Sequence, residues 1–247
     1  MSAAPVIRRF ADLDALSHAA ADELGAIARA AVAERGSCHI ALSGGSTPKH
    51  LFHLLARAGR EALPWDHVEL WWGDERAVPP DHPDSNYGMA RAALTEPLGL
   101  DASHIHRMAG ELDPAAAARG YEDELVAALG GPPILDLVLL GMGPDGHTAS
   151  LFPGSPALDE TRRWVVANVV TSPLVHGTAT RITLTAPAIN AARQVRFLIT
   201  GADKAAALAQ VLEGPRDPKR YPSQLIAGVD LAWLVDTAAA ASLGVRA

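Results

Sequence analysis

The chain has 247 residues, 49% of them hydrophobic and 20% charged, which excludes disordered, collagen-like and coiled-coil proteins. Lys and Arg number 21 against 28 Asp and Glu, and the net charge of −7 disfavours general nucleic-acid binding because phosphate backbones are negative too. The only cysteine is Cys38, no apolar run is long enough to span a membrane, and the chain begins without an apolar leader. We therefore expect a cytoplasmic protein that has neither a membrane nor a nucleic acid as partner.

Short apolar runs rich in β-forming residues alternate with Ala-rich stretches along the chain, which predicts βαβ units. A first strand is expected at 6–10 and a long helix at 12–35, ended by Gly36. Further helices are expected at 50–57 and 205–212, and further strands at 39–42, 68–72, 135–140, 164–170, 195–200 and 231–235. The sequence thus predicts one domain, 1–247. Its fold is an open, mostly parallel α/β sheet with helices on both faces, a Rossmann-like, modified doubly wound arrangement.

In open α/β sheets ligands bind outside the carboxyl ends of the strands, so the segment after each predicted strand is a candidate site. The first such segment reads Ser43, Gly44, Gly45, Ser46, Thr47, Pro48. The glycines allow tight curvature, Thr47 is a potential cap, and Pro48 suits the first helical position. Backbone N–H groups at the helix start would then bind a phosphate, although an ordinary capped turn fits the same residues. The spacing is not that of a Walker A loop.

Three cations elsewhere are candidates for anion binding. Arg76 ends the charged run 74–76 directly after a strand, where it either points toward an anion or oxyanion or lies on a solvated surface. Lys204 falls at the first turn of the last predicted helix, where the helix dipole disfavours a cation. Either an anion compensates there or the lysine is an ordinary surface residue. Arg181, which opens the run 181–185, is an equally open candidate.

The segment 139–154 is the most informative. Gly141, Gly143 and Gly146 match the G-x-G-x-x-G pattern of dinucleotide sites. We reject that interpretation because Asp145 would occupy the position of the pyrophosphate, and no acidic ribose ligand follows the next predicted strand. The segment instead places His147 at an expected helix start, two residues after a carboxylate. The alternatives are a catalytic histidine and a structural one.

Motifs of several other chemistries are missing from the sequence. There is no G-x-S-x-G elbow, no H-E-x-x-H and no cluster with metal-ligand spacing. We therefore expect neither a serine nucleophile nor a metal.

Taken in chain order from Ile40 to Lys204, the motifs resemble those of the 6-phosphogluconolactonase family. They are the segments 43–48, 72–76, 141–154, 181–183 and 201–204, each weak alone but specific as a set. The resemblance implies hydrolysis of 6-phosphoglucono-1,5-lactone to 6-phosphogluconate, the second step of the oxidative pentose phosphate pathway. It also implies that the reaction needs no metal or organic cofactor.

The resemblance further implies roles for single residues. His147 would act as the base on water, and Arg76 would stabilise charge around the carboxyl end of the lactone. The loop 43–47, with Arg181 and Lys204, would hold the phosphate. Asp145 would orient His147, contact sugar hydroxyls or only shape the turn.

Two other functions compete with this interpretation. Glucosamine-6-phosphate deaminases share the Gly-rich loop and Asp-Gly-His, but they typically continue with Ala-Phe-Asn-Glu-Pro-Gly where residues 149–154 read Ala-Ser-Leu-Phe-Pro-Gly. A non-catalytic sugar-phosphate sensor usually adds a DNA-binding helical segment, for which we see no room. We expect a monomer, and the residues 79–86 fit a mobile lid or an inert turn equally well.

Overall fold

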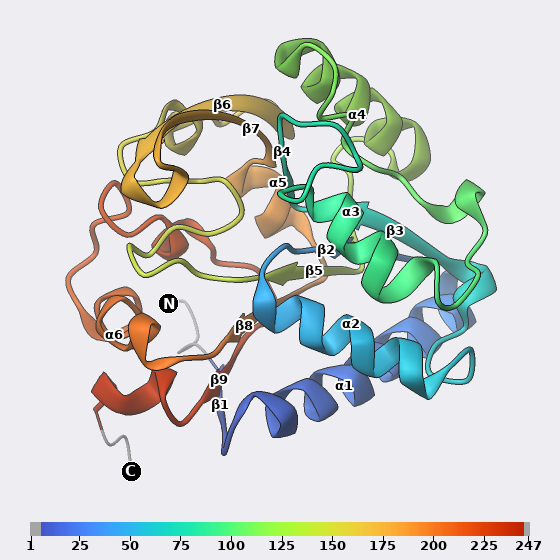
Figure 1. Cartoon of the computed structure of the whole chain (residues 1–247), viewed down its shortest axis with the longest axis horizontal. Helices are drawn as coiled ribbons and strands as arrows, with labels where there is room; N and C mark the ends of the chain where they lie inside the picture. The colour runs from blue at the N-terminus through green and yellow to red at the C-terminus, as the bar shows by residue number, and fades with distance from the viewer. Residues whose placement is uncertain (1–5, 245–247) are drawn as a thin grey trace.

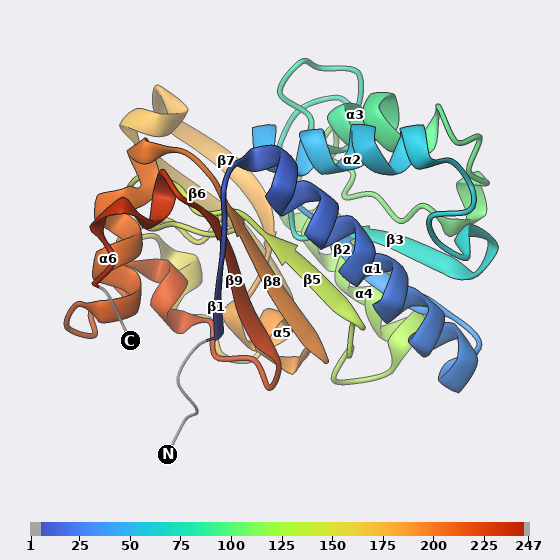
Figure 2. The ribbon, with the colours of Figure 1, turned by 90° about the horizontal axis from the view of Figure 1, so that it is seen from below.

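The computed structural model describes residues 6–244, so the ends of the expected domain, 1–5 and 245–247, lie outside the described residues. The larger of two sheets has six strands in the order β1-β9-β8-β5-β2-β3, and every neighbouring pair is parallel (Figure 2). These strands are β1 (Val6–Phe10), β2 (Cys38–Leu42), β3 (Val68–Trp72), β5 (Leu137–Leu140), β8 (Gln194–Ile199) and β9 (Leu231–Asp236). The mostly parallel α/β sheet is thus confirmed.

Capping residues explain where the first helix of the chain begins and ends. The helices of the fold are α1 (Leu13–Arg35), α2 (Ser46–Ala58), α3 (Asn86–Ala90), α4 (Pro114–Leu129), α5 (Ala186–Ala191) and α6 (Ala205–Glu213). The side chain of Asp12 caps α1 by accepting from the N–H of Ala15, and Gly36 ends it in the left-handed conformation, as predicted. Figure 1 shows α1 and α2 below β2 and β5, with α5 and the second sheet above them.

The second sheet was not predicted. It is antiparallel, with the order β4 (Asp74–Arg76), β7 (Gly177–Leu184) and β6 (Val165–Ser172). The strand expected at 164–170 is therefore real, but it belongs to this smaller sheet and not to the parallel one. α4 packs against β6 and β7, which encloses the buried end of the hairpin.

Gly73 joins the two sheets. Its N–H donates to the carbonyl of Leu42 in the parallel sheet, 2.8 Å away. Its own carbonyl accepts from the N–H of Leu184 in the antiparallel sheet, also at 2.8 Å. The chain thus leaves β3 and enters β4 within one residue, which brings the second sheet to the carboxyl edge of the first.

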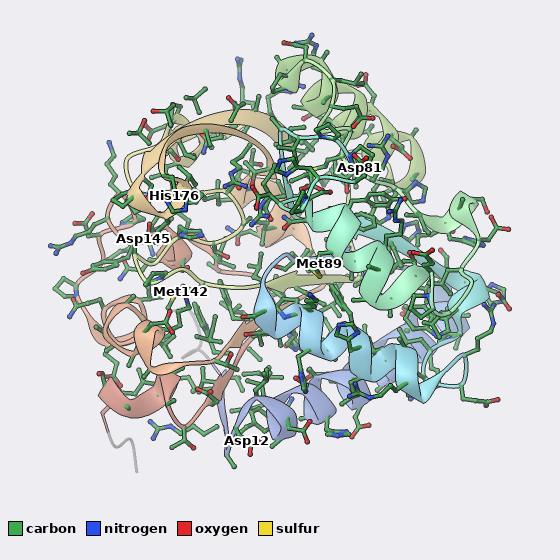
Figure 3. All side chains as sticks on the ribbon, in the orientation of Figure 1. Asp12, Asp81, Met89, Met142, Asp145 and His176 are labelled. Atoms are coloured by element: carbon green, nitrogen blue, oxygen red, sulfur yellow. The ribbon has the colours of Figure 1, made fainter. Side chains whose placement is uncertain are left out.

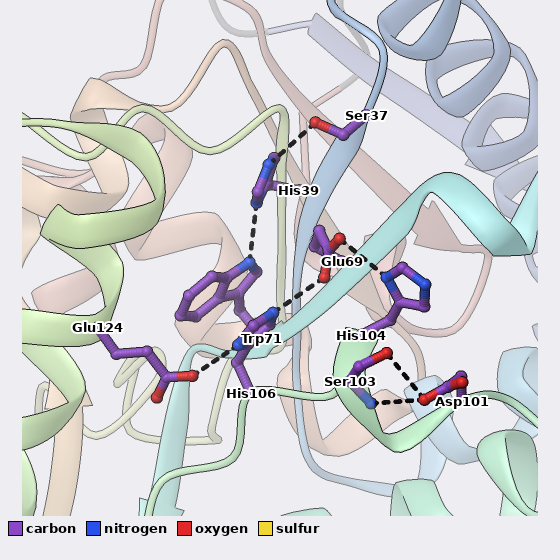
Figure 4. A network of polar contacts seen from close by, with 9 residues as sticks. All are labelled: Ser37, His39, Glu69, Trp71, Asp101, Ser103, His104, His106 and Glu124. Atoms are coloured by element: carbon purple, nitrogen blue, oxygen red, sulfur yellow. Dashed lines mark hydrogen bonds and ion pairs between the residues drawn. The ribbon is translucent and has the colours of Figure 1, made fainter.

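The edge strand β3 is covered by the segment that follows α3. The backbone N–H of His106 donates to the carbonyl of Leu70 at 2.9 Å. The imidazoles of His104 and His106 both hydrogen-bond to Glu69. The His106 ring also hydrogen-bonds to Glu124 of α4 at 2.6 Å. Figure 4 draws these contacts with two neighbouring groups, Ser37–His39–Trp71 and Ser103–Asp101, and the Trp71 ring stacks on His106 with centroids 3.9 Å apart. The edge is therefore closed to pairing with another strand.

Candidate active site

The carboxyl ends of β2, β5 and β8 meet at one edge of the parallel sheet, beside a pocket of about 290 Å³. The segments that follow these strands line the pocket together with residues of β4 and β7. Its wall includes the predicted residues Ser43, Gly44, Gly45, Ser46, Thr47, Arg76, His147, Arg181 and Lys204. Segments from both sheets therefore bring the imidazole, the cations and the candidate anion loop to one place.

The anion loop, residues 43–47, connects β2 to α2 and is capped differently from our prediction. α2 begins at Ser46 and not at residue 50, so Thr47 lies inside the first turn instead of capping it. The Thr47 hydroxyl pairs with that of Thr200, 2.7 Å away, which ties the loop to the end of β8. Gly45 has a φ of 106°, which glycine adopts at least cost. None of the described side chains caps α2, so the N–H groups of its first turn remain for a ligand in the pocket.

His147 lies in the loop after β5, and the expected helix start at this residue is wrong. The next helical segment in the chain is Pro156–Asp159, so no dipole of a helix beginning at His147 acts on its ring. Side chains hold the ring instead: Nδ1 lies 2.6 Å from Oδ1 of Asp145, and the ring stacks on Phe152 with centroids 4.0 Å apart. A Cβ at Gly143 would come within 2.1 Å of the imidazole, so only glycine fits there.

Asp145 fixes the protonation pattern of this ring. Burial raises the pKa of the Asp145 carboxyl, but the hydrogen bond and charge of His147 outweigh burial and hold that pKa below its ordinary value. The carboxylate also accepts from the backbone N–H of His147 at 3.1 Å. Because an ionised carboxylate only accepts hydrogen bonds, Nδ1 carries a proton, which leaves Nε2 as the nitrogen that can act as a base.

Asp145 does not line the pocket itself. It borders a neighbouring cavity of about 420 Å³, which also touches residues 171–174 at the turn between β6 and β7. Figure 3 labels Asp145 and also His176, which follows residues 171–174 in that turn. Asp145 is thus the one predicted site residue that reaches the pocket only through another side chain.

Three cations border the pocket. Arg76 and Arg181 are register partners across β4 and β7, so their guanidinium groups belong to neighbouring strands of one small sheet. Nε and Nη1 of Arg181 are buried and have no partner among residues 6–244. Burial lowers the pKa of Arg181, and the charge of Arg76 lowers it further. Lys204 pairs with Asp203 at 2.8 Å, so part of the expected anionic compensation comes from its own neighbour in the chain. Two adjacent guanidinium groups, of which that of Arg181 has unpaired buried donors, favour an anionic ligand.

Sequence reasoning missed four polar residues of the pocket wall, Asp74, Asn86, Ser150 and Thr200. Oδ2 of Asp74 accepts from the Ser150 hydroxyl at 2.6 Å, and Oδ1 accepts from Nδ2 of Asn86 at 3.2 Å. The alternation of a strand was the available signal, because it places Asp74 on the same face as Arg76. Asn86 and Ser150 gave no such signal, since their contacts join segments far apart in the chain.

The segment 79–86 contributes to the site at its end. The Arg76 guanidinium donates to the carbonyl of Asp84, and the side chain of Asn86 lines the pocket.

Within residues 6–244, no three His, Cys, Asp or Glu side chains are grouped so that they could hold a metal ion. Over the same residues, no helix has the length and apolar character needed to cross a membrane.

The fold and the pocket define an α/β protein with a pocket bordered by cationic side chains and with a His–Asp pair at the carboxyl edge of its parallel sheet. A family model described as glucosamine-6-phosphate isomerases/6-phosphogluconolactonase matches residues 11–233. The chain belongs to this family.

Among curated relatives, a 6-phosphogluconolactonase of Synechocystis is 45% identical over 86% of this chain and 88% of its own length. One of Mycobacterium tuberculosis is 43% identical over 96% of this chain and 98% of its own. The solved structure of a 6-phosphogluconolactonase from Trypanosoma cruzi superposes with a TM-score of 0.86, is 32% identical and covers 98% of both chains. A solved glucosamine-6-phosphate deaminase, 24% identical with a TM-score of 0.80 over 96% of this chain and 99% of its own, shares the fold.

Proposed function

We propose that this chain is a lactone hydrolase that converts 6-phosphoglucono-1,5-lactone to 6-phosphogluconate, the second step of the oxidative pentose phosphate pathway. The observation that carries the proposal is that one pocket combines a candidate phosphate site with a candidate base. The candidate phosphate site is the loop 43–47 with Arg181 and Lys204, and the candidate base is His147. The relatives from Synechocystis and M. tuberculosis carry the name of this activity.

His147 is the general base of the proposed mechanism. Nε2 takes a proton from a water molecule, whose oxygen then attacks the lactone carbonyl carbon. The carboxylate of Asp145, 2.6 Å from Nδ1, stabilises the imidazolium that forms. A positioned base of this kind contributes a factor of about 10²–10⁴ to the rate.

The remaining charges act on the tetrahedral intermediate and on the phosphate. Arg76 stabilises the oxyanion, a contribution whose loss typically costs about 2.7–4 kcal/mol. When the ring C–O bond breaks, the imidazolium returns its proton to the departing oxygen, which becomes a hydroxyl group of the product. The loop 43–47, Arg181 and Lys204 hold the phosphate and so fix the carbonyl beside the base.

Alkali consumption separates this function from its two competitors. The purified chain should accelerate acid release from 6-phosphoglucono-1,5-lactone well above the spontaneous rate and release no ammonia from glucosamine 6-phosphate. Ammonia release would favour the deaminase. Binding of the sugar phosphate without any turnover would favour a sensor.

We also propose that the enzyme is a one-domain, cytoplasmic monomer. The buried Cys38 is the only cysteine, so the chain needs no oxidising compartment. Residues of both sheets of one chain line the pocket, so a second copy is not needed to form it. Sedimentation at micromolar concentration should give the mass of one chain, and unfolding should follow a single transition by near-UV and far-UV signals alike.

A further inference from the structure

Glu75 is a buried carboxylate beside the pocket for which the proposed mechanism has no role. It lies in β4 between Asp74 and Arg76, which both line the pocket. Because side chains alternate along a strand, Glu75 points to the opposite face. Its exposed fraction is only 2%, and it does not contribute to the pocket wall.

Four donors surround the Glu75 carboxylate. Oε1 accepts from the backbone N–H groups of Arg76 and Asn86, both at 2.7 Å. Oε2 accepts from the backbone N–H of Tyr87 at 2.7 Å and from the hydroxyl of Ser85 at 3.0 Å. Burial raises the pKa of the Glu75 carboxyl above its ordinary value, and these four hydrogen bonds offset part of that rise. Each oxygen thus faces two donors, which suits an ionised carboxylate and no neutral side chain of the same size.

The backbone that Glu75 holds leads directly to the anion loop. The Asn86 side chain donates to the carbonyl of Asp74 at 2.9 Å and lies against the backbone of Gly44. A Cβ at Gly44 would come within 1.9 Å of Oδ1 of Asn86, so loop and amide are in direct contact. One residue before Ser85, the carbonyl of Asp84 accepts from the Arg76 guanidinium.

We propose that Glu75 is a positioning residue, whose carboxylate fixes the segment 84–87 so that Asn86 supports the anion loop and Asp84 orients Arg76. Glu75 touches no substrate and acts only through these residues. The inference rests on the proposed lactone hydrolysis and extends it to a residue behind the pocket. It follows that a change at Glu75 disturbs both the binding of the phosphate and the stabilisation of the oxyanion.

Glu75→Gln tests the proposal with little change in shape. Whichever way the amide is turned, its NH₂ group faces two donors, so the segment 84–87 must move. We expect kcat/KM for the lactone to fall about 10²-fold, the effect of a displacement of roughly 1 Å at an active site. Glu75→Asp keeps two acceptor oxygens and should recover part of the loss.

Glu122→Gln is the matched control. Glu122 is also a buried carboxylate, 8% exposed, and accepts from Nε of Arg163 and from the N–H of Trp164 at 2.5 Å each, but it does not line the pocket. This variant should lose thermal stability yet keep kcat/KM within about twofold, because neither Glu122 nor its partners Arg163 and Trp164 line the pocket. Equal losses of kcat/KM in both variants would reduce Glu75 to a purely structural role and overturn the proposal.

Titration calorimetry with 6-phosphogluconate provides a readout that does not depend on turnover. The affinity of Glu75→Gln should fall at least tenfold, whereas that of Glu122→Gln should not change. A wild-type chain without lactonase activity would refute the proposed function, and an unchanged affinity of Glu75→Gln would refute the positioning role separately. Should Glu75→Gln not fold, Ser85→Ala removes one of the donors, and its kcat/KM should fall about fivefold, the equivalent of one hydrogen bond. No change in that variant would also overturn the proposal.

Discussion

Replacing Asp145 by Asn removes the negative charge behind His147 and keeps the shape of the side chain. The amide oxygen still accepts from the backbone N–H and from Nδ1–H, which lie 3.1 and 2.6 Å from Oδ1 in the wild type. The ring therefore keeps its orientation and its tautomer. What is lost is the difference between a charged and a neutral hydrogen bond to the imidazolium, about 1–1.5 kcal/mol, or about tenfold in kcat.

The assay is alkali consumption during lactone hydrolysis, measured for Asp145→Asn, His147→Ala and the double variant. His147→Ala should lower kcat by about 10²–10⁴-fold with little change in KM, since it removes the base and not the phosphate site. The double variant should be no slower than His147→Ala alone. Residues that act as one unit give non-additive effects, and Asp145 acts through the ring.

A tenfold loss on adding Asp145→Asn to His147→Ala would refute this reasoning. It would mean that Asp145 contributes without the imidazole, either by contacting sugar hydroxyls or by shaping the turn. Thermal unfolding of each variant controls for the last possibility, because a disturbed turn lowers the melting temperature whether or not the imidazole is present.

Three further predictions follow from single contacts. Lys204→Ala should raise KM about tenfold or more and leave kcat nearly unchanged, because the phosphate loses one charged hydrogen bond. An unaltered affinity of this variant for 6-phosphogluconate would exclude Lys204 from the phosphate site. Gly44→Ala should lower kcat/KM because the new Cβ displaces the anion loop. Gly36→Ala is its control: no atom lies within 4 Å of the added Cβ, so this variant should lose stability and keep kcat/KM unchanged. Hydrogen bonding to Arg107 lowers the pKa of Glu111 from 4.5 to about 2, so its contribution to folding is complete above the unfolded value and is lost as the pH falls toward 2. In urea titrations, the stability difference between the wild type and Glu111→Gln should therefore shrink between pH 6 and pH 2, and a constant difference would argue against this pair.

The parallel sheet was predictable because its strands are short apolar runs. All residues of β5 are buried, for example, as the uniform run Leu137–Leu140 suggests. The second sheet escaped prediction for the opposite reason. β7 is exposed at one end and buried at the other, and β4 has only three residues, so neither carries a pattern of its own. Their pairing depends on contacts between segments far apart in the chain.

The residues of the candidate site also fall into those that the sequence predicts and those that only the tertiary structure reveals. Loops at the ends of parallel strands are predictable from the strands, which is why the anion loop and His147 could be named beforehand. The helix expected at His147 was wrong because glycines and a histidine after a strand also suit a compact loop. Contacts such as Thr47 with Thr200, or Ser150 with Asp74, depend on the tertiary fold and cannot be inferred from one sequence.

The single residue between β3 and β4 has a consequence for how the gene for this protein can vary. Gly73 sets the phase of β4, and inserting or deleting one residue there would turn every side chain of that strand to the other face. Asp74 and Arg76 would leave the pocket, and Glu75 would enter it. A point substitution in this stretch changes one side chain, whereas a change in its length inverts the whole lining at once, so natural variants should keep the spacing between Trp72 and Arg76 constant.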